Sequence, residues 1–182
     1  MLALTIAAYA IGIVIIACGS AILISMQIAR KSAAPFFPSM ASTIRLALRA
    51  ASLKPGETFY DLGAGTGTSL IVAAQEFHAR AIGMEISVLP YLIARARIAV
   101  TRARRATVLF HDLFKEDLRS ADVVFCFLAD RVLPQIEMKL AKELAPGARI
   151  ISYAFPLPGM IPDRIVPVHG AWKLYLYVIN NR

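Results

Sequence analysis

The sequence predicts an α/β fold of the Rossmann-like type, with a mostly parallel sheet, helices on both faces and a C-terminal β-hairpin. Three observations support this prediction. Short apolar runs alternate with helical patterns between Glu57 and Phe155. A glycine-rich turn joins the first run to the first helix, which is typical of nucleotide-type domains. The chain then closes with two strand-like runs on either side of His169-Gly170, the pattern of a hairpin.

The N-terminal segment differs in composition from the rest of the chain. Residues 1–29 contain no Asp, Glu, Lys or Arg. As a helix they would extend for roughly 43 Å, enough to cross a hydrocarbon core of about 30 Å. A cleaved signal peptide would have a basic start and a shorter apolar run. We therefore expect one transmembrane helix at residues 1–29, ahead of the α/β domain.

Charge indicates how the chain is oriented and what it contacts. Arg30 and Lys31 follow the apolar segment directly, so the positive-inside rule places the domain in the cytoplasm or the interior of an organelle. The net charge of +8, on a domain tethered to a membrane, indicates contact with anionic lipid headgroups. No nucleic-acid motif accompanies this charge, and we expect no nucleic-acid partner. Cys18 and Cys126 form neither a disulfide framework nor a metal-binding pattern.

Residues 30–39 are expected to be a linker, and residues 40–182 the domain. The linker contains Phe36 and Phe37 between two prolines, which favour an extended backbone. These rings either pack against the start of the next helix or form a lid over a ligand site. Met40–Ala51 has the apolar spacing of an amphipathic helix.

The remaining elements follow in order. We expect strands at Arg80–Glu85, Ala106–His111, Ala121–Leu128, Arg149–Phe155, Ile165–Val168 and Trp172–Ile179, and helices at Ser69–Phe77, Leu89–Arg102 and Arg131–Leu144. Arginines gather toward the end of the Leu89–Arg102 helix. They form either a solvated face or a patch that binds lipid or substrate.

The glycine-rich turn indicates the kind of ligand. Gly63, Gly65 and Gly67 follow the first strand, but a dinucleotide fingerprint requires glycine at position 68, which is Thr68. Asp61 ends the strand just before the turn. Its carboxylate would repel a pyrophosphate and attract a ligand with an ammonium and a sulfonium group. The pattern therefore favours S-adenosylmethionine (SAM) over a dinucleotide.

Two further acids end the next two expected strands. Glu85 lies 22 residues after Gly63, about the spacing at which an acid meets the ribose hydroxyls of a nucleotide. Asp112 follows the next strand, where it could accept a hydrogen bond from the adenine amino group. Acids at three successive strand ends strengthen the prediction of a SAM site.

These residues resemble a known family. The runs DLGAGTG, GMEIS, HDLF and LAPGARIIS resemble the motifs of class I SAM-dependent methyltransferases, which have a seven-stranded sheet, over about residues 40–179. The Pro-Phe-Phe-Pro-Ser element and the N-terminal apolar segment further resemble the small membrane-anchored protein-lysine methyltransferases, which include the methyltransferase of the ATP synthase c-subunit. The resemblance implies a cofactor site formed by Asp61, Gly63, Ala64, Gly65, Gly67, Glu85, Ile86, Asp112 and Leu113.

The sequence also departs from this family. Thr66 and Thr68 stand where the family often has Asp and Arg. Many amino-group methyltransferases have an Asn/Asp-Pro-Pro-aromatic motif after the fourth strand, whereas this chain has Phe127-Leu128-Ala129-Asp130. These departures leave the acceptor less well defined than the cofactor.

Methyl transfer needs an acceptor that is positioned in a water-poor site. A lysine must first lose its proton, which burial in an apolar channel favours, and aromatic rings attract its cationic forms. The candidates for this role are Phe127, Asp130, Tyr153, Phe155 and the linker residue Phe37 with its neighbour Phe36. Asp130 could orient the incoming ammonium. His111 is expected to be structural, because strand alternation points it away from Asp112.

Three hypotheses follow. The first is a SAM-dependent methyltransferase that acts on lysines of a membrane-associated protein. The second is a methyltransferase for a small or lipidic acceptor, such as a quinone or a phospholipid headgroup. The third is a SAM-binding membrane module without catalysis. The sequence predicts no metal site and leaves the oligomeric state open.

Overall fold

The structure, a computed structural model, describes residues 5, 9–13, 16, 19–20 and 40–180. The expected linker, with Phe36 and Phe37, lies outside these residues, as does most of the expected transmembrane segment. The described residues of that segment are helical. Within the described ranges, no helix is both long and apolar enough to cross a membrane.

The domain follows the predicted order of elements, with each boundary within two residues of its expected position. The strands are β1 (Thr58–Leu62), β2 (Arg80–Glu85), β3 (Ala106–Phe110), β4 (Val123–Cys126), β5 (Arg149–Tyr153), β6 (Arg164–Pro167) and β7 (Lys173–Val178). The helices are α2 (Ala41–Ala50), α3 (Thr68–Glu76), α4 (Val88–Val100) and α5 (Leu133–Glu143), and a short 3₁₀ turn, η1 (Asp130–Val132), precedes α5.

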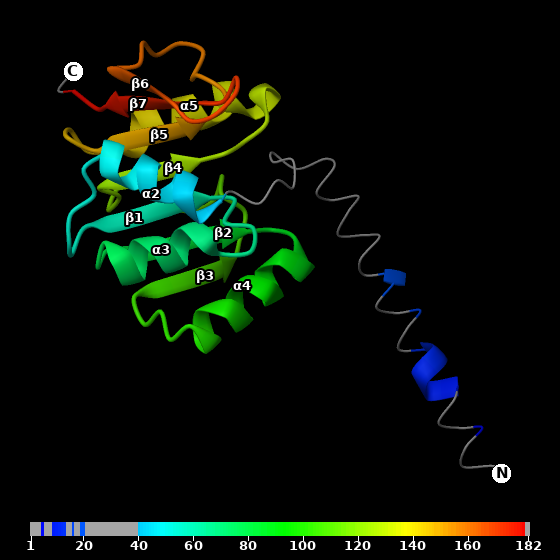
Figure 1. Cartoon of the computed structure of the whole chain (residues 1–182). Helices are drawn as coiled ribbons and strands as arrows, with labels where there is room; N and C mark the ends of the chain where they lie inside the picture. The colour runs from blue at the N-terminus through cyan, green and yellow to red at the C-terminus, as the bar shows by residue number, and fades with distance from the viewer. Residues whose placement is uncertain (1–4, 6–8, 14–15, 17–18, 21–39, 181–182) are drawn as a thin grey trace.

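The strands form one seven-stranded sheet in the order β3-β2-β1-β4-β5-β7-β6 (Figure 1). β1 to β5 are parallel, and β7 pairs antiparallel with both β5 and β6. The chain moves outward from β1 through β2 to β3 and then returns to place β4 on the other side of β1. Such a reversal opens a crevice at the carboxyl ends of the strands, where ligands of open α/β sheets bind.

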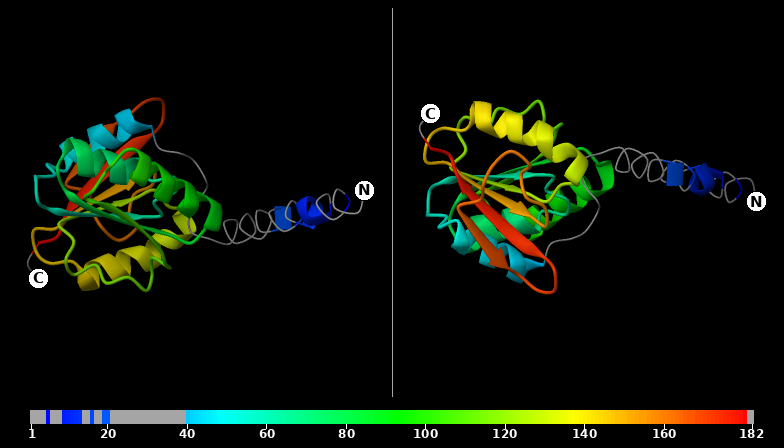
Figure 2. Two further views of the ribbon diagram at one scale, coloured as in Figure 1. Left: turned by 90° about the horizontal axis from the view of Figure 1, so that it is seen from below. Right: turned by 90° about the horizontal axis from the view of Figure 1, so that it is seen from above.

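Helices cover both faces of the sheet, as predicted (Figure 2). Two buried apolar clusters show which helix lies where. Phe59 and Val123 face α2 and α3, whereas Leu62 and Val124 pack with α5 on the opposite face. Because side chains alternate along a strand, Asp61 shares the α3 face with Phe59. This register aims the carboxylate at the start of α3.

Candidate functional site

The glycine turn between β1 and α3 lies at the carboxyl edge of the sheet. Gly63 and Ala64 both donate backbone hydrogen bonds to the carbonyl of Met84, at 3.1 and 2.8 Å. Gly63, Gly65 and Gly67 have φ angles of +104°, +54° and +78°, in the region that favours glycine. The repeated glycines are therefore required by the path of the backbone.

Close packing holds this turn against its neighbours. A Cβ added at Gly67 would lie 3.1 Å from the Cβ of Ala94 in α4. A Cβ added at Gly83, in β2, would lie 2.6 Å from the Cβ of Ala64 and 2.7 Å from a methyl carbon of Leu70. The turn thus packs too closely against α4, and β2 too closely against the turn and α3, to leave room for a Cβ at either glycine.

Asp61 is buried at the end of β1, and the Ser69 hydroxyl in α3 donates a hydrogen bond to it. Burial raises the pKa of the Asp61 carboxyl to about 7; the Ser69 hydrogen bond opposes this rise and the charge of Glu85 adds to it. A cationic ligand would offset the cost of ionising this group. The site therefore suits the ammonium and sulfonium groups of SAM.

Glu85, at the end of β2, links the glycine turn to the start of α4. One carboxylate oxygen accepts the Gly65 N–H at 2.9 Å, and the other accepts the Ser87 N–H at 2.7 Å. The side chain is half-buried. A carboxylate has about four lone-pair sites, so each oxygen can accept a further hydrogen bond. Ribose hydroxyls are donors of the right kind.

The third acid, Asp112, follows β3, the neighbour of β2. It is half-buried, and its Oδ1 accepts the Phe114 N–H at 3.0 Å. The half-buried Leu113 follows it, and Ile86, which is 39% exposed, follows Glu85 on the adjacent strand. These side chains offer apolar surface and one acceptor, which fits an adenine ring and its amino group.

Arg97 in α4 also supports the turn, although no sequence pattern predicted this role. Its Nη1 donates to the Thr66 carbonyl at 2.7 Å and to the hydroxyls of Thr66 and Thr68, each at 3.0 Å. Thr66 and Thr68 are also the two residues of the glycine turn at which the sequence departs from the family. An arginine from α4 thus holds the turn here.

Three aromatic rings meet at the other half of the same edge. Phe127 follows β4, Tyr153 ends β5, and Trp172 precedes β7. The ring centroids are 4.7 Å apart for Phe127 and Tyr153, 5.6 Å for Phe127 and Trp172, and 5.4 Å for Tyr153 and Trp172. The rings touch one another, so a cation would contact their outer faces. We call Phe127, Tyr153 and Trp172 the aromatic cluster.

The start of α2 reaches the aromatic cluster. Tyr153 is buried, which raises the pKa of its phenol, and it shares a hydrogen bond with the Thr43 side chain in α2. No sequence pattern predicted a role for Trp172 or Thr43. The antiparallel return of β7, implied by the hairpin, is the signal that could have placed Trp172 at this edge.

Asp130 and Phe155, two other candidates for contact with the lysine, lie outside this cluster. Asp130 is exposed at the start of η1, and its Oδ1 accepts the Arg131 N–H at 2.7 Å. Phe155 is 37% exposed, and its carbonyl accepts the Ser152 hydroxyl at 2.6 Å. His111 is exposed, with Nε2 3.9 Å from the carboxylate of Glu116. Phe37 belongs to the segment that the structure leaves undescribed.

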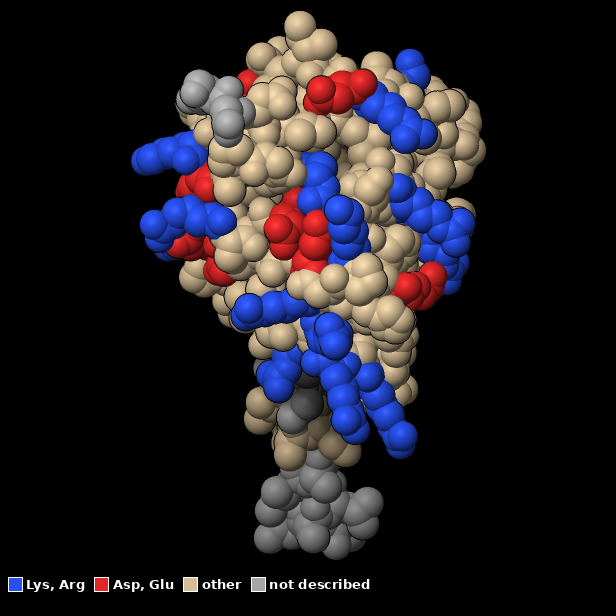
Figure 3. Space-filling view, turned by 90° about the vertical axis from the view of Figure 1, so that its left-hand side faces the viewer, with Lys and Arg blue, Asp and Glu red and all other residues tan. Residues whose placement is uncertain are grey.

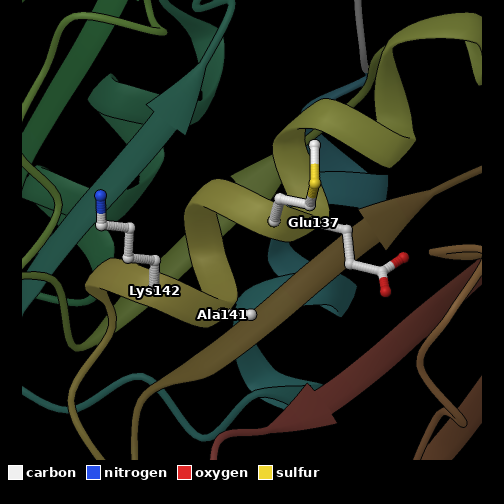
Figure 4. A pocket seen from close by; sticks show the side chains of 4 residues that line it. Glu137, Ala141 and Lys142 are labelled. Atoms are coloured by element: carbon white, nitrogen blue, oxygen red, sulfur yellow. The ribbon is translucent and has the colours of Figure 1, made fainter.

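A hollow lies along α5 (Figure 4). Glu137, Met138, Ala141 and Lys142 line it. It is open to solvent and contains none of the predicted site residues. We therefore do not assign the cofactor to it.

Comparison with known proteins identifies the family. Residues 61–164 match the ANTKMT methyltransferase domain. A protein-lysine N-methyltransferase of Saccharolobus islandicus is 33% identical over 152 residues, covering 81% of this chain and 94% of that protein. The chain belongs to the ANTKMT methyltransferase family.

Other relatives of this ANTKMT-family chain come from animals. The mouse adenine nucleotide translocase lysine N-methyltransferase is 35% identical over 150 residues, covering 81% of this chain and 64% of that protein. The lysine N-methyltransferase of the ATP synthase c-subunit from Xenopus laevis is 32% identical over 142 residues, covering 75% and 60%. The chain thus spans less than two thirds of these two proteins.

Solved structures confirm the class I methyltransferase fold of the ANTKMT-family domain. An RNA methyltransferase from Salinibacter ruber, in complex with S-adenosyl-L-homocysteine, has a TM-score of 0.77 and 28% identity, covering 80% of this chain and 95% of that one. The chain is a SAM-dependent methyltransferase. The predictions of the α/β fold of the domain, of the enzyme class and of the cofactor are therefore confirmed, whereas the transmembrane helix and the roles of individual residues stay predictions.

Proposed function

We propose that this chain methylates lysine side chains of a membrane-associated protein. The observation that carries the proposal is the division of one sheet edge into an acidic half, at β1 to β3, and an aromatic half, at β4, β5 and β7. The relatives named as lysine methyltransferases support a lysine acceptor. Two of them are named for the adenine nucleotide translocase and the ATP synthase c-subunit, which supports a membrane-associated protein as the acceptor.

In this proposal the acidic half binds SAM, which when bound supplies a methyl group that leaves its sulfur for the acceptor nitrogen. Asp61 and the glycine turn, with Gly63, Ala64, Gly65 and Gly67, hold the methionine part. Glu85 accepts hydrogen bonds from the ribose. Asp112, with Ile86 and Leu113, binds the adenine. These roles rest on the charge and position of each group at the strand ends.

The aromatic half receives the lysine. The outer faces of Phe127 and Trp172 are half-exposed and attract the ammonium group. Contact with these rings and with buried Tyr153 removes water, which lowers the lysine pKa and favours the neutral amine. Asp130, exposed at the start of η1, orients the ammonium as it arrives. Phe155 and Phe37 are the remaining candidates for contact with the lysine.

The N-terminal segment brings the domain to its acceptor. We propose that residues 1–29 anchor the chain in a membrane and that residues 30–39 link this anchor to the domain. Arg30 and Lys31 favour a domain on the cytoplasmic or organelle-interior side. Such a tether raises the effective concentration of neighbouring membrane proteins.

The test incubates the full chain with methyl-labelled SAM and a membrane fraction. We expect label in methyllysine, located by mass spectrometry of proteolytic peptides. Glu85→Ala should abolish the labelling. Glu76→Ala is a matched control. Glu76 is an exposed glutamate at the end of α3 that pairs with Arg45 at 2.7 Å, and it is not one of the acids at the carboxyl ends of the strands.

Separate extractions distinguish the other hypotheses. Label in lipids or quinones alone would overturn the lysine proposal in favour of a small acceptor. Label in RNA alone would favour the chemistry named for the Salinibacter ruber structure. SAM binding without transfer to any fraction would support a binding module.

A further inference from the structure

The outward face of α4 is apolar. Its exposed side chains include Val88, Leu89, Leu92 and Ile93, which are 43, 44, 52 and 36% exposed, and Val100, which is 83% exposed. Exposed alanines complete the surface at positions 96 and 99. A helix that covers a sheet normally turns its polar side outward. We call this surface the α4 outer face.

Helical geometry shows that this face is continuous. At about 100° per residue, the seven positions 88, 89, 92, 93, 96, 99 and 100 fall within an arc of about 140°. Pro90, Ala94 and Ile98 occupy the opposite side and pack toward the sheet. Arg95 and Arg97 lie at the two margins of the arc. The helix contains no acidic residue.

Basic residues continue beyond the end of the helix. Arg102, Arg104 and Arg105 are exposed in the turn that leads to β3. In Figure 3, Lys and Arg side chains gather at the bottom of the domain, the level at which Figure 1 draws the end of α4. The α4 outer face therefore joins a cationic margin with an apolar surface.

The apolar surface extends to the edge strand. Phe110 in β3 is 53% exposed, and its ring centroid lies 5.3 Å from that of Tyr91 in α4. The described residues of the N-terminal segment do not cover this surface, because Tyr9, Ile11 and Ile16 are themselves 60 to 71% exposed. The surface needs a partner that accepts apolar side chains and carries negative charge.

We propose that the α4 outer face lies in the interface of a membrane that contains anionic lipid. Apolar side chains of an interfacial helix enter the boundary between headgroups and acyl chains, while exposed arginines beside it, here Arg102, Arg104 and Arg105, pair with lipid phosphates. The convex shape of a single helix and the absence of acids on it favour a lipid surface over a protein groove. This contact is independent of the proposed lysine acceptor.

Contact between α4 and the membrane would also orient the carboxyl edge of the sheet, where the proposed cofactor site lies. α4 begins three residues after Glu85, so its start belongs to the carboxyl edge of the sheet. A membrane bound along α4 would hold the proposed cofactor site close to the lipid surface. The N-terminal segment would limit the distance between the domain and the membrane, and α4 would set the orientation of the domain on the membrane surface.

The test measures contact at single positions in the full chain. A polarity-sensitive fluorophore is attached at Leu92→Cys in a Cys18→Ser background, because Cys126 is buried and we expect it to be inert toward the label. The matched control is Met138→Cys on α5, an exposed apolar position on the opposite face of the sheet, 67% exposed. Both proteins are reconstituted into phosphatidylcholine vesicles with and without phosphatidylglycerol, and lipids with brominated chains serve as quenchers.

We expect the label at position 92 to shift to the blue and to be quenched several-fold more strongly than the label at 138. The difference should grow with phosphatidylglycerol and shrink when Arg102, Arg104 and Arg105 are replaced by Gln. Equal quenching at both positions in vesicles that contain the chain would overturn the proposal. A blue shift without lipid would also overturn it: dependence on protein concentration would indicate a second copy, and independence would indicate the chain's own N-terminal segment. SAM binding by each labelled protein verifies folding.

Discussion

Asp61 is the residue whose surroundings most constrain the chemistry of the site. It is buried beside Ser69, and its pKa of about 7 means that the carboxyl is partly protonated near neutral pH. Only the ionised form attracts a cation. The protonation state of this one group therefore couples cofactor binding to pH.

We predict that SAM binds more tightly as the pH rises toward about 7. Below this value the carboxyl must lose its proton on binding, which weakens affinity by up to about tenfold per pH unit. Calorimetry between pH 5.5 and 7 would measure the trend, a range in which the SAM amino group keeps its charge. Asp61→Asn should bind weakly with little dependence on pH; a wild-type affinity that does not change with pH would contradict the prediction.

The same group should make the free enzyme less stable as the pH rises. The pKa of Asp61 is about 7 in the folded chain and 3.8 as its ordinary value. Its folded pKa is raised, so its contribution to stability is complete below about pH 4 and is lost as the pH rises through about 7. Denaturant unfolding at several pH values should show this loss. Asp61→Asn should remove it, and an unchanged slope in that variant would assign the effect to other groups.

At the scale of elements, α4 supports the glycine turn through Arg97. We predict that Arg97→Ala weakens SAM affinity several-fold, because the turn loses three hydrogen bonds from the guanidinium group. Arg95→Ala is the matched control, since Arg95 stacks over Tyr91 at 5.8 Å and does not reach the turn. Calorimetry with both variants is the measurement, and equal losses would show that the charge of α4 matters rather than this contact.

Packing between β2 and α3 leads to another prediction. Gly83→Ala should lower the free energy of unfolding by about 1–3 kcal/mol, the usual cost of overpacking a core. The added Cβ would meet Ala64 and Leu70. Combining it with Leu70→Val should cost less than the sum of the two single changes, as a double-mutant cycle would measure. Strict additivity would show that the strand shifts to accommodate the methyl group.

Sequence patterns predict the elements well because they reflect burial. The run Arg80–Glu85 matches β2 at both ends, since its interior is buried between two layers of helices. The acids at three strand ends were likewise visible, because parallel strands place their carboxyl ends together. The Arg97 contacts were not visible in the sequence, because they join residues about 30 positions apart through an exposed side chain. Trp172 was missed since its place depends on the pairing of β7 with β5.

At the scale of the whole molecule, the site has two halves with different roles. We predict that Trp172→Leu raises the KM for the acceptor several-fold and leaves SAM affinity unchanged, because the Trp172 ring contacts Phe127 and Tyr153 in the half of the edge that we propose receives the lysine. Tyr175→Leu is the matched control, because Tyr175 is an aromatic residue in β7, the strand that follows Trp172, and packs on the α5 face. Steady-state kinetics and calorimetry together are the measurement. Weaker SAM binding by Trp172→Leu would place this ring in the cofactor half.

The order of the strands has a consequence for how such an enzyme diversifies. All of the proposed cofactor residues precede β4, and the aromatic cluster comes entirely after it begins. One continuous stretch of the gene thus encodes the proposed cofactor residues, and the next encodes the aromatic cluster. Recombination between β3 and β4 could give a chimaera a new substrate while it inherits an intact donor site.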